Sequence, residues 1–342
     1  MKRLLWLLPL LLIGALLLAG LELQRRWEQP LNIAARGVVF EVEQGDSLRR
    51  IAVRLAEEGI LSEPQLLIAY GRYTGVDSRL KHGEYRLQPG TTAEGLLQLL
   101  ERGEVIQYQV TLPEGLTLAQ ALALLAADPV LDQRLAAVDD ERIAALTADY
   151  PGPEGLFLPE TYRFARGDSD WDILQRAFAA MEAVLAEEWA VRAADLPLAS
   201  PYEALILASI VERETGVPAE RGEIAGVFIR RLHKNMRLQT DPTIIYGLGD
   251  AFDGDLRRSH LRDEANPYNT YRHGGLPPTP IALPGRAAIH AALNPAPGET
   301  LFFVARGDGS HEFSVTLEAH ERAVRKYQLR RRADYRSNPG KP

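Results

Sequence analysis

The chain contains no cysteine and shows no basic stripe. Without cysteine, disulfide bonds and thiolate metal sites are excluded, and the absence suits an oxidising compartment without proving one. The formal net charge is −7, and the basic residues are scattered apart from the run Arg330, Arg331 and Arg332. A dedicated nucleic-acid binder would concentrate its basic residues on one face, so no nucleic-acid partner is expected.

Histidines are few, and they do not suggest a metal centre. His260, His273 and His311 lack the spacing of metal ligands, so surface or structural roles are expected for them. The chain of 342 residues is 46% hydrophobic and 25% charged, which is ordinary for a protein with two compact domains. There is no internal repeat and no low-complexity tract.

The first 22 residues contain a long uncharged segment. Residues 4–21 carry no charge and are mostly leucine. At about 1.5 Å per residue the segment covers roughly 27 Å, close to a hydrocarbon core of about 30 Å. A cleaved signal peptide would have a shorter apolar core and a small-x-small site, and a lipoprotein would need a cysteine. An uncleaved transmembrane anchor over residues 1–22, with a short cytoplasmic tip, is therefore favoured, and a linker over 23–36 follows it.

A small α+β module is expected over residues 37–105. A strand at 37–42 leads into a helix that Asp46 or Ser47 can cap. Further helices are expected near 63–73 and over 92–102, with a strand at 83–87 between them. Residues 42–55 read Val-x-x-Gly-Asp-Ser-Leu-x-x-Ile-Ala-x-x-Leu. This pattern resembles the opening of a LysM module, which binds glycans that contain N-acetylglucosamine, although a capped helix after a strand explains the same residues.

A larger α+β domain is expected over residues 106–330, followed by a frayed tail over 331–342. It begins with a strand at 107–112 and a helix that Thr117 caps. A hairpin near its end joins strands at 301–305 and 313–315. Its best-defined helix has Ser200 and Glu203 as a capping box, Pro201 in the first turn, and Gly216 and Pro218 after its end.

The end of that helix is the strongest candidate for chemistry. Residues 204–211 are apolar on every face except Ser209, which indicates a buried helix, and Glu212 follows at once. Burial and the negative end of the helix dipole both favour a protonated Glu212, as a general acid requires. Glu214 lies roughly 200° around the helix, so it is expected to be solvated or salt-bridged rather than to share a site with Glu212. A structural helix end explains both glutamates without catalysis.

Five blocks in order resemble the membrane-anchored endolytic murein (peptidoglycan) transglycosylases, the MltG or YceG-like family. Residues 208–215, Ala-Ser-Ile-Val-Glu-Arg-Glu-Thr, are similar to the active-site helix of that family. The other four blocks are residues 154–162, residues 236–243, residues 267–271 together with 275–278, and residues 311–314. The chain departs from the family pattern at Asn266 (usually Ser), Thr279 (usually Gly) and Leu283 (usually Asn), and in the order Leu-Phe-Leu-Pro at 156–159. Leu283 lacks a hydrogen-bonding side chain, which puts substrate contacts there in doubt.

The resemblance implies an endolytic lytic transglycosylase, a lyase of cell-wall biogenesis and degradation. It would cleave the β-1,4 bond between N-acetylmuramic acid (MurNAc) and N-acetylglucosamine (GlcNAc) without water, leave 1,6-anhydro-MurNAc ends, and terminate growing strands. Glu212 would be the catalytic acid and base, and no metal or organic cofactor is required. The implied setting is the inner membrane, single-pass, with the catalytic domain on the outer (periplasmic) side and glycan polymerases or penicillin-binding proteins as partners. The candidate substrate-binding residues are Glu154, Gln239, Asp241, Tyr268, Asn269 and Tyr271.

Two alternatives stay open at this point. A hydrolytic muramidase would need a second carboxylate to activate water, with Asp241 or Glu160 as candidates. A non-catalytic scaffold would bind glycan through the LysM-like module and cleave nothing.

Overall fold

The computed structural model describes residues 7–328. The first six residues of the predicted anchor and the predicted frayed tail lie outside the described residues. The chain forms two compact units. The first comprises Met1–Gln109 with Val130–Asp132 and Arg163–Asp168, and the second comprises Val110–Pro129, Gln133–Tyr162 and Ser169–Pro342. The fold is mixed α and β, with small two-stranded sheets of order β1-β2, β3-β4 and β5-β6.

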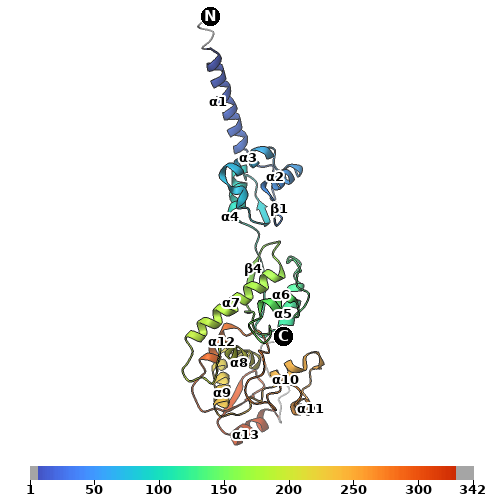
Figure 1. The fold of residues 1–342 in the computed structure, drawn as a ribbon, viewed down its shortest axis with the longest axis vertical. Helices are drawn as coiled ribbons and strands as arrows, with labels where there is room; N and C mark the ends of the chain where they lie inside the picture. The colour runs from blue at the N-terminus through green and yellow to red at the C-terminus, as the bar shows by residue number, and fades with distance from the viewer. Residues whose placement is uncertain (1–6, 329–342) are drawn as a thin grey trace. The chain divides into compact units, whose positions relative to one another are not determined.

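The first unit closely follows the elements expected from the sequence (Figure 1). Its strands β1 and β2 pair antiparallel, with Val38 opposite Leu87 and Val42 opposite Gly83. Helices α2 and α3 lie between these strands along the chain, so the order is strand, helix, helix, strand. The elements are α1 (Leu7–Glu28), β1 (Val38–Val42), α2 (Leu48–Glu57), α3 (Pro64–Thr74), the short 3-10 helix η1 (Val76–Ser78), β2 (Gly83–Leu87) and α4 (Ala93–Arg102).

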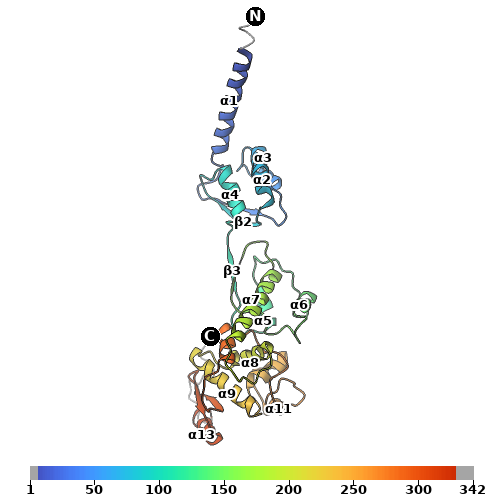
Figure 2. The same ribbon diagram turned by 60° about the vertical axis from the view of Figure 1, so that its left-hand side comes forward.

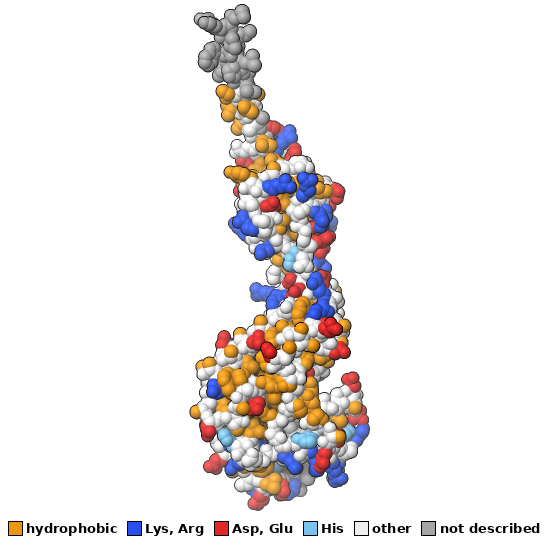
Figure 3. Space-filling model, viewed as in Figure 1, with side chains coloured by type: hydrophobic (Ala, Val, Ile, Leu, Met, Phe, Trp, Pro, Cys, Tyr) orange, Lys and Arg blue, Asp and Glu red, His pale blue; other side chains and the backbone are white. Residues whose placement is uncertain are grey.

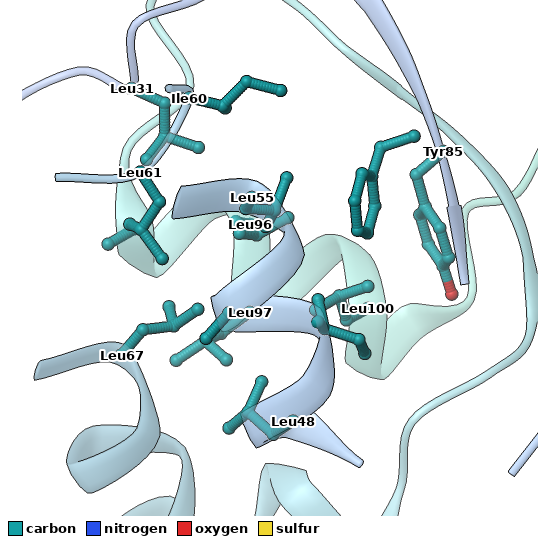
Figure 4. Close-up of a cluster of buried hydrophobic side chains, with 14 of the residues drawn as sticks. Leu31, Leu48, Leu55, Ile60, Leu61, Leu67, Tyr85, Leu96, Leu97 and Leu100 are labelled. Carbon is teal, nitrogen blue, oxygen red and sulfur yellow. The ribbon is translucent and has the colours of Figure 1, made fainter. Parts of the chain in front are cut away.

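Helix caps and one apolar core hold the first unit together. Ser47 caps α2 by accepting from the N–H of Arg50, and Thr92 caps α4 by accepting from the N–H of Gly95. The predicted apolar face of α2 is buried and packs with α3, α4 and Tyr85 of β2 (Figure 4). The sequence pattern at 42–55 therefore gives the predicted capped and buried helix, and the LysM-like interpretation stays a prediction.

Helix α1 contacts the rest of the first unit at its C-terminal end. The ring centroids of Trp27 and Tyr70 lie 4.5 Å apart, and Arg26 forms an ion pair with Glu63 at 2.9 Å. Among residues 7–328, no helix has both the length and the apolar character needed to cross a membrane.

The second unit is mainly helical (Figures 1 and 2). The boundary between the units falls within β3 and β4. The hairpin β5-β6 turns at residues 306–310, as expected, and pairs Phe302 with Ser314. The elements are β3 (Tyr108–Thr111), α5 (Leu118–Ala126), α6 (Glu141–Leu146), β4 (Thr161–Phe164), α7 (Asp170–Ala190), α8 (Pro201–Glu214), η2 (Pro218–Glu220), α9 (Arg221–His233), α10 (Asp241–Leu248), η3 (Gly249–Ala251), α11 (Arg258–Arg262), α12 (Arg286–Leu293), β5 (Phe302–Ala305), β6 (His311–Ser314) and α13 (Leu317–Tyr327).

Helix α8 has the predicted N-terminus with one difference. The Ser200 side chain accepts from the N–H of Glu203. The Glu203 carboxylate accepts from the N–H of Ala199 at 2.6 Å, one residue before the N-cap, so the reciprocal bond of the expected capping box is displaced. Thr117 and Gln120 of α5 form a complete capping box.

On the face drawn in Figure 3, charged side chains of both signs are interspersed over each unit. Exposed i, i+4 ion pairs include Arg26 with Glu22 at 3.1 Å and Arg322 with Glu318 at 2.6 Å. Exposed pairs of this kind contribute little to stability, so the fold depends on its buried apolar residues.

Candidate active site

Helix α8 is buried on nearly all sides, as its sequence predicts. All residues from Ala204 to Val211 are buried, and the helix packs against α7, α9, α10 and α12. Its one polar residue in that stretch, Ser209, donates to the carbonyl of Ile206 at 2.7 Å and accepts from the N–H of Ile281 at 3.0 Å. Ser209 therefore connects α8, the helix that carries Glu212, to the loop that precedes α12 through a hydrogen bond.

Replacing Ser209 with alanine is expected to lower the free energy of unfolding by about 1–3 kcal/mol, because the buried N–H of Ile281 would lose its acceptor. Denaturant titration of the purified protein measures the change. Ser259→Ala, at an exposed position in α11, is the matched control and should change stability by less than about 0.5 kcal/mol. Equal effects of the two substitutions would contradict this role of Ser209.

The Glu212 carboxylate lies at the C-terminal end of α8 in a nearly closed environment. Its side chain is only 5% exposed. One oxygen, Oε2, accepts from the N–H of Gly285 at 3.1 Å, and Oε1 lies 3.4 Å from Nη2 of Arg221. Gly285 is the N-cap residue of α12, and Arg221 is the first residue of α9. Three separate segments therefore meet at this carboxylate.

A second carboxylate, Glu114, lies beside Glu212. Its Oε2 is 3.2 Å from the same Arg221 Nη2, and its side chain is 44% exposed. The loop that carries Glu114 pairs with the loop before α12: the N–H of Gly115 donates to the carbonyl of Leu283 at 2.9 Å, and the N–H of Leu283 donates to the carbonyl of Leu116 at 2.7 Å. Glu114 thus comes from a segment far away in sequence.

Electrostatics at this position favour a protonated Glu212. Burial raises its pKa most, and the negative charge of Glu114 raises it further. The N–H of Gly285 and the guanidinium of Arg221 act in the opposite direction. Arg213 does not fold back onto Glu212; its Nη1 donates to the carbonyl of Gly115 at 2.8 Å. The geometry fits a carboxyl group that can give up a proton and take one back.

Glu214 is placed differently from the sequence expectation of a solvated or salt-bridged group. Its carboxylate accepts from the hydroxyl of Thr240, and burial raises its pKa to about 7. As predicted, it does not share the Glu212 site. It anchors the segment that carries Gln239 and Asp241, because Thr240 lies between them.

The predicted residues Gln239, Asp241 and Tyr271 come together beside Glu214. The Tyr271 hydroxyl donates to Oδ1 of Asp241 at 2.7 Å, and the N–H of Gln239 donates to the carbonyl of Thr270 at 3.2 Å. Gln239 has φ of 51°, a left-handed conformation that is uncommon outside glycine. Such strained positions concentrate at functional sites, which fits a binding role for this side chain.

Asn269 is wholly buried and shapes a loop. It has 0% exposure, and its Nδ2 donates to the carbonyls of His260 at 3.1 Å and Asp263 at 2.7 Å. Its Oδ1 accepts from the N–H of Tyr271 at 3.1 Å. The amide is therefore used within the protein, and any effect of Asn269 on substrate passes through the position of Tyr271.

Tyr268 and Glu154 belong to a separate group of polar residues, of which Glu154 is buried. Glu154 accepts from the N–H of Leu118 at 2.9 Å and from the hydroxyl of Tyr246 at 3.2 Å. Tyr246 packs edge-on against Tyr268, and the Tyr268 hydroxyl lies 2.8 Å from Oγ1 of Thr279. Within residues 7–328, neither Glu154 nor Tyr268 forms a hydrogen bond with Glu212.

Glu154 should make stability depend on pH. Burial raises its pKa to about 7, so its contribution to stability is greatest at low pH and is lost as pH rises through about 7. Relative to Glu154→Gln, the wild type should lose about 3 kcal/mol of unfolding free energy between about pH 5 and pH 8. The same change of unfolding free energy with pH in both proteins would contradict the burial of a titrating Glu154. Glu318→Gln, at an exposed position, is the control and should keep the pH dependence of the wild type.

The carboxylates proposed for a hydrolytic reaction lie elsewhere. Asp241 binds Tyr271, and Glu160 is exposed and accepts from the N–H of Thr161 at 2.7 Å.

The sequence did not predict that Glu114 lies at the site, because it stands in a Pro-Glu-Gly turn and nothing near it in sequence indicates that the loop meets α8. Arg221 was also not predicted, because nothing near it in sequence indicates that the start of α9 meets Glu212.

The departures from the family pattern have local structural explanations in two cases. Asn266 caps a turn by accepting from the N–H of Tyr268 at 2.9 Å, a task that a serine can also perform. Thr279 forms a hydrogen bond with the Tyr268 hydroxyl through its own hydroxyl group. Leu283 has a fully buried side chain and contributes its backbone groups to the Glu114 loop.

Among the described residues, no group of three histidine, aspartate or glutamate side chains is arranged to hold a metal ion. His311 instead binds Glu220 through Nδ1 at 2.8 Å, and His273 contacts the carbonyl of Glu264 at 3.1 Å.

Comparison with known proteins matches residues 40–326 to the model of the YceG-like family. An endolytic murein transglycosylase of Bacillus subtilis is 30% identical over 335 residues, covering 93% of this chain and 91% of the relative. An endolytic murein transglycosylase of Streptococcus pneumoniae is 28% identical, and the match covers 84% of this chain and 58% of that protein. The crystal structure of a YceG-like protein from Listeria monocytogenes aligns with a TM-score of 0.55 at 30% identity, covering 84% of this chain and 99% of that one. With most of its length matched in sequence and fold, the chain belongs to the YceG-like family.

Proposed function

We propose that this protein is an endolytic peptidoglycan lytic transglycosylase in which Glu212 is the catalytic acid and base. The observation that carries the proposal is the Glu212 carboxyl group, which is nearly buried near the end of α8 and held by one N–H and one guanidinium. Burial keeps such a group protonated until it transfers its proton, and the names of the relatives support the same reaction class.

The proposed reaction needs no external nucleophile. Glu212 donates its proton to the glycosidic oxygen between MurNAc and GlcNAc as the bond from that oxygen to the anomeric carbon breaks. The 6-hydroxyl oxygen of the same MurNAc then bonds to the anomeric carbon, and its proton returns to the Glu212 carboxylate. The tethered hydroxyl replaces water or a second carboxylate, because an intramolecular attack has a large proximity advantage. The product carries a 1,6-anhydro-MurNAc end.

Gln239, Asp241 and Tyr271 are the proposed direct contacts to the glycan. The Tyr271 phenol and the Asp241 carboxylate lie within hydrogen-bond distance of each other, and Gln239 adds an amide two residues before Asp241; these groups suit the N-acetyl and hydroxyl groups of sugars. Asn269, Tyr268 and Glu154 support substrate binding indirectly in this proposal, since their polar atoms are occupied within the protein.

The proposed setting is the outer side of the cytoplasmic membrane. The uncharged run at residues 4–21 supports a single-pass anchor, and the strand-helix-helix-strand order of the first unit supports a LysM-like module that binds the same glycan. An enzyme held there would act on newly made strands and terminate their elongation. Glycan polymerases and penicillin-binding proteins are the proposed partners.

A hydrolytic muramidase is the second candidate, and Glu114 is the observation that favours it. This carboxylate is partly exposed and lies beside Glu212, so it could activate a water molecule. Glu114 is already engaged in an ion pair with Arg221 at 3.2 Å, which favours the non-hydrolytic reaction.

Mass spectrometry of the fragments released from purified glycan strands separates these candidates. The transglycosylase proposal predicts ends that are one water lighter than reducing ends. Reducing ends would instead assign a hydrolase. Glycan binding without any cleavage, by both wild type and Glu212→Gln, would assign the scaffold alternative.

A further inference from the structure

The arrangement of charges around Glu212 extends the proposed function, on which this inference rests. We propose that Glu114 and Arg221 are positioning residues whose ion pairing changes with the protonation of Glu212. While Glu212 carries its proton, the Arg221 guanidinium pairs with Glu114. Once the proton has left, Arg221 pairs with the Glu212 carboxylate and stabilises it. Neither residue lies in the helix that carries Glu212.

One nitrogen of Arg221 serves both carboxylates. Its Nη2 lies 3.2 Å from Oε2 of Glu114 and 3.4 Å from Oε1 of Glu212. The Arg221 side chain is 13% exposed, and its Nε is buried without a hydrogen-bond partner among the described residues. A guanidinium with an unused donor and two acceptors at slightly long distances can tighten onto either carboxylate with a small movement.

Gly285 makes the shared arrangement possible. A Cβ at this position would lie 1.9 Å from Oε1 of Glu114, so only glycine leaves room for that carboxylate. The N–H of the same residue donates to Glu212 at 3.1 Å. The Glu114 loop is fixed in turn by the backbone pairing of Gly115 and Leu116 with Leu283 and by the Arg213 side chain. Backbone contacts therefore position the Glu212 carboxylate and the loop that carries Glu114, and Arg221 binds both carboxylates.

Charge balance explains what the pair would do. With Glu212 protonated, Glu114 and Arg221 neutralise each other, so no free positive charge forces Glu212 to ionise. After Glu212 donates its proton, the site gains one negative charge, and Arg221 is already in place to receive it. An Arg221 without Glu114 would hold Glu212 in its ionised form, which cannot act as an acid.

The other charged groups near this position are directed elsewhere. On α8, Arg213 binds the carbonyl of Gly115, and Glu214 binds Thr240. From α12, only the backbone of Gly285 reaches Glu212, since Arg286 binds Glu188. Glu220, which precedes α9, binds His311. Glu114 and Arg221 are therefore the charges that face Glu212 directly.

The test is the pH dependence of glycan cleavage by the full-length protein. In Glu114→Gln the alkaline limb of the rate profile should move to lower pH by about one unit, giving about a tenfold loss of rate above that limb. In Arg221→Gln the limb should move to higher pH, and the maximal rate should fall because the Glu212 carboxylate loses its cation. These opposite shifts would not result from simple structural damage.

Two further variants complete the design. Gly285→Ala keeps both charges but pushes the Glu114 carboxylate away from Arg221, so its limb should move in the same direction as in Glu114→Gln. Glu321→Gln, at an exposed position in α13, should keep the wild-type profile. A uniform loss of rate with an unmoved limb in both Glu114→Gln and Arg221→Gln would overturn the inference. If Glu212→Gln stays active, the proposed function itself fails; if that variant is inactive and the limbs do not move, only this inference fails.

Discussion

Replacing Glu212 with glutamine is expected to reduce glycan cleavage by about a thousandfold or more, because one residue supplies both proton transfers. Glutamine keeps the size of the side chain and an oxygen that can accept from the N–H of Gly285. It cannot donate a proton to a leaving oxygen or take one from a hydroxyl. The loss should appear in the release of soluble fragments from purified strands.

The folded state should survive this substitution. Burial raises the pKa of Glu212, so ionisation at higher pH costs the wild type some stability that the glutamine variant keeps. The thermal midpoint of Glu212→Gln should therefore equal or exceed that of the wild type at alkaline pH. Activity within tenfold of the wild type would remove Glu212 from its proposed role.

Replacing Gly155 with alanine should give the largest loss of stability, about 3–4 kcal/mol. Gly155 has φ of 83°, where a side chain costs about 1–2 kcal/mol. An added Cβ would also lie 2.4 Å from Cβ of Pro280, and overpacking of this kind costs roughly 1–3 kcal/mol. The proline ring cannot turn away, so the loop that supplies Ile281 and Gly285 to α8 should shift, and cleavage should fall with stability.

Gly275→Ala is the matched control for this prediction. Gly275 has φ of 79°, nearly the same backbone conformation, but no atom lies within 4 Å of an added Cβ. It should lose only the conformational part, about 1–2 kcal/mol. Denaturant titration of both variants measures the difference, and equal losses would show that contact with Pro280 has no energetic effect.

Local elements could be predicted well because their signals lie close together in sequence. The predicted caps at Ser47, Thr117 and Ser200 and the apolar repeat of α2 correspond to the observed helices. The burial of the α8 segment before Glu212 also followed from composition alone, since residues 204–211 contain a single polar side chain.

The surroundings of Glu212 could not be predicted in the same way. Glu114, Arg221 and Gly285 reach it from three segments, and their meeting depends on tertiary packing that no local pattern encodes. Glu214 shows the same limit: its position on the helix was predicted correctly, but its burial against Thr240 comes from a distant loop. Asn269 had the chemistry of a sugar ligand, yet three backbone groups of the protein use it.

The most direct test of the central claim is cleavage of purified glycan strands in water enriched in heavy oxygen, followed by mass spectrometry of the new ends. If Glu212 promotes attack by the 6-hydroxyl of MurNAc, the wild type will form anhydro ends that contain no oxygen from the solvent. Glu212→Gln will form none of these ends. Solvent oxygen in the new ends would show that water is the nucleophile, and would contradict the account by making the enzyme a hydrolase.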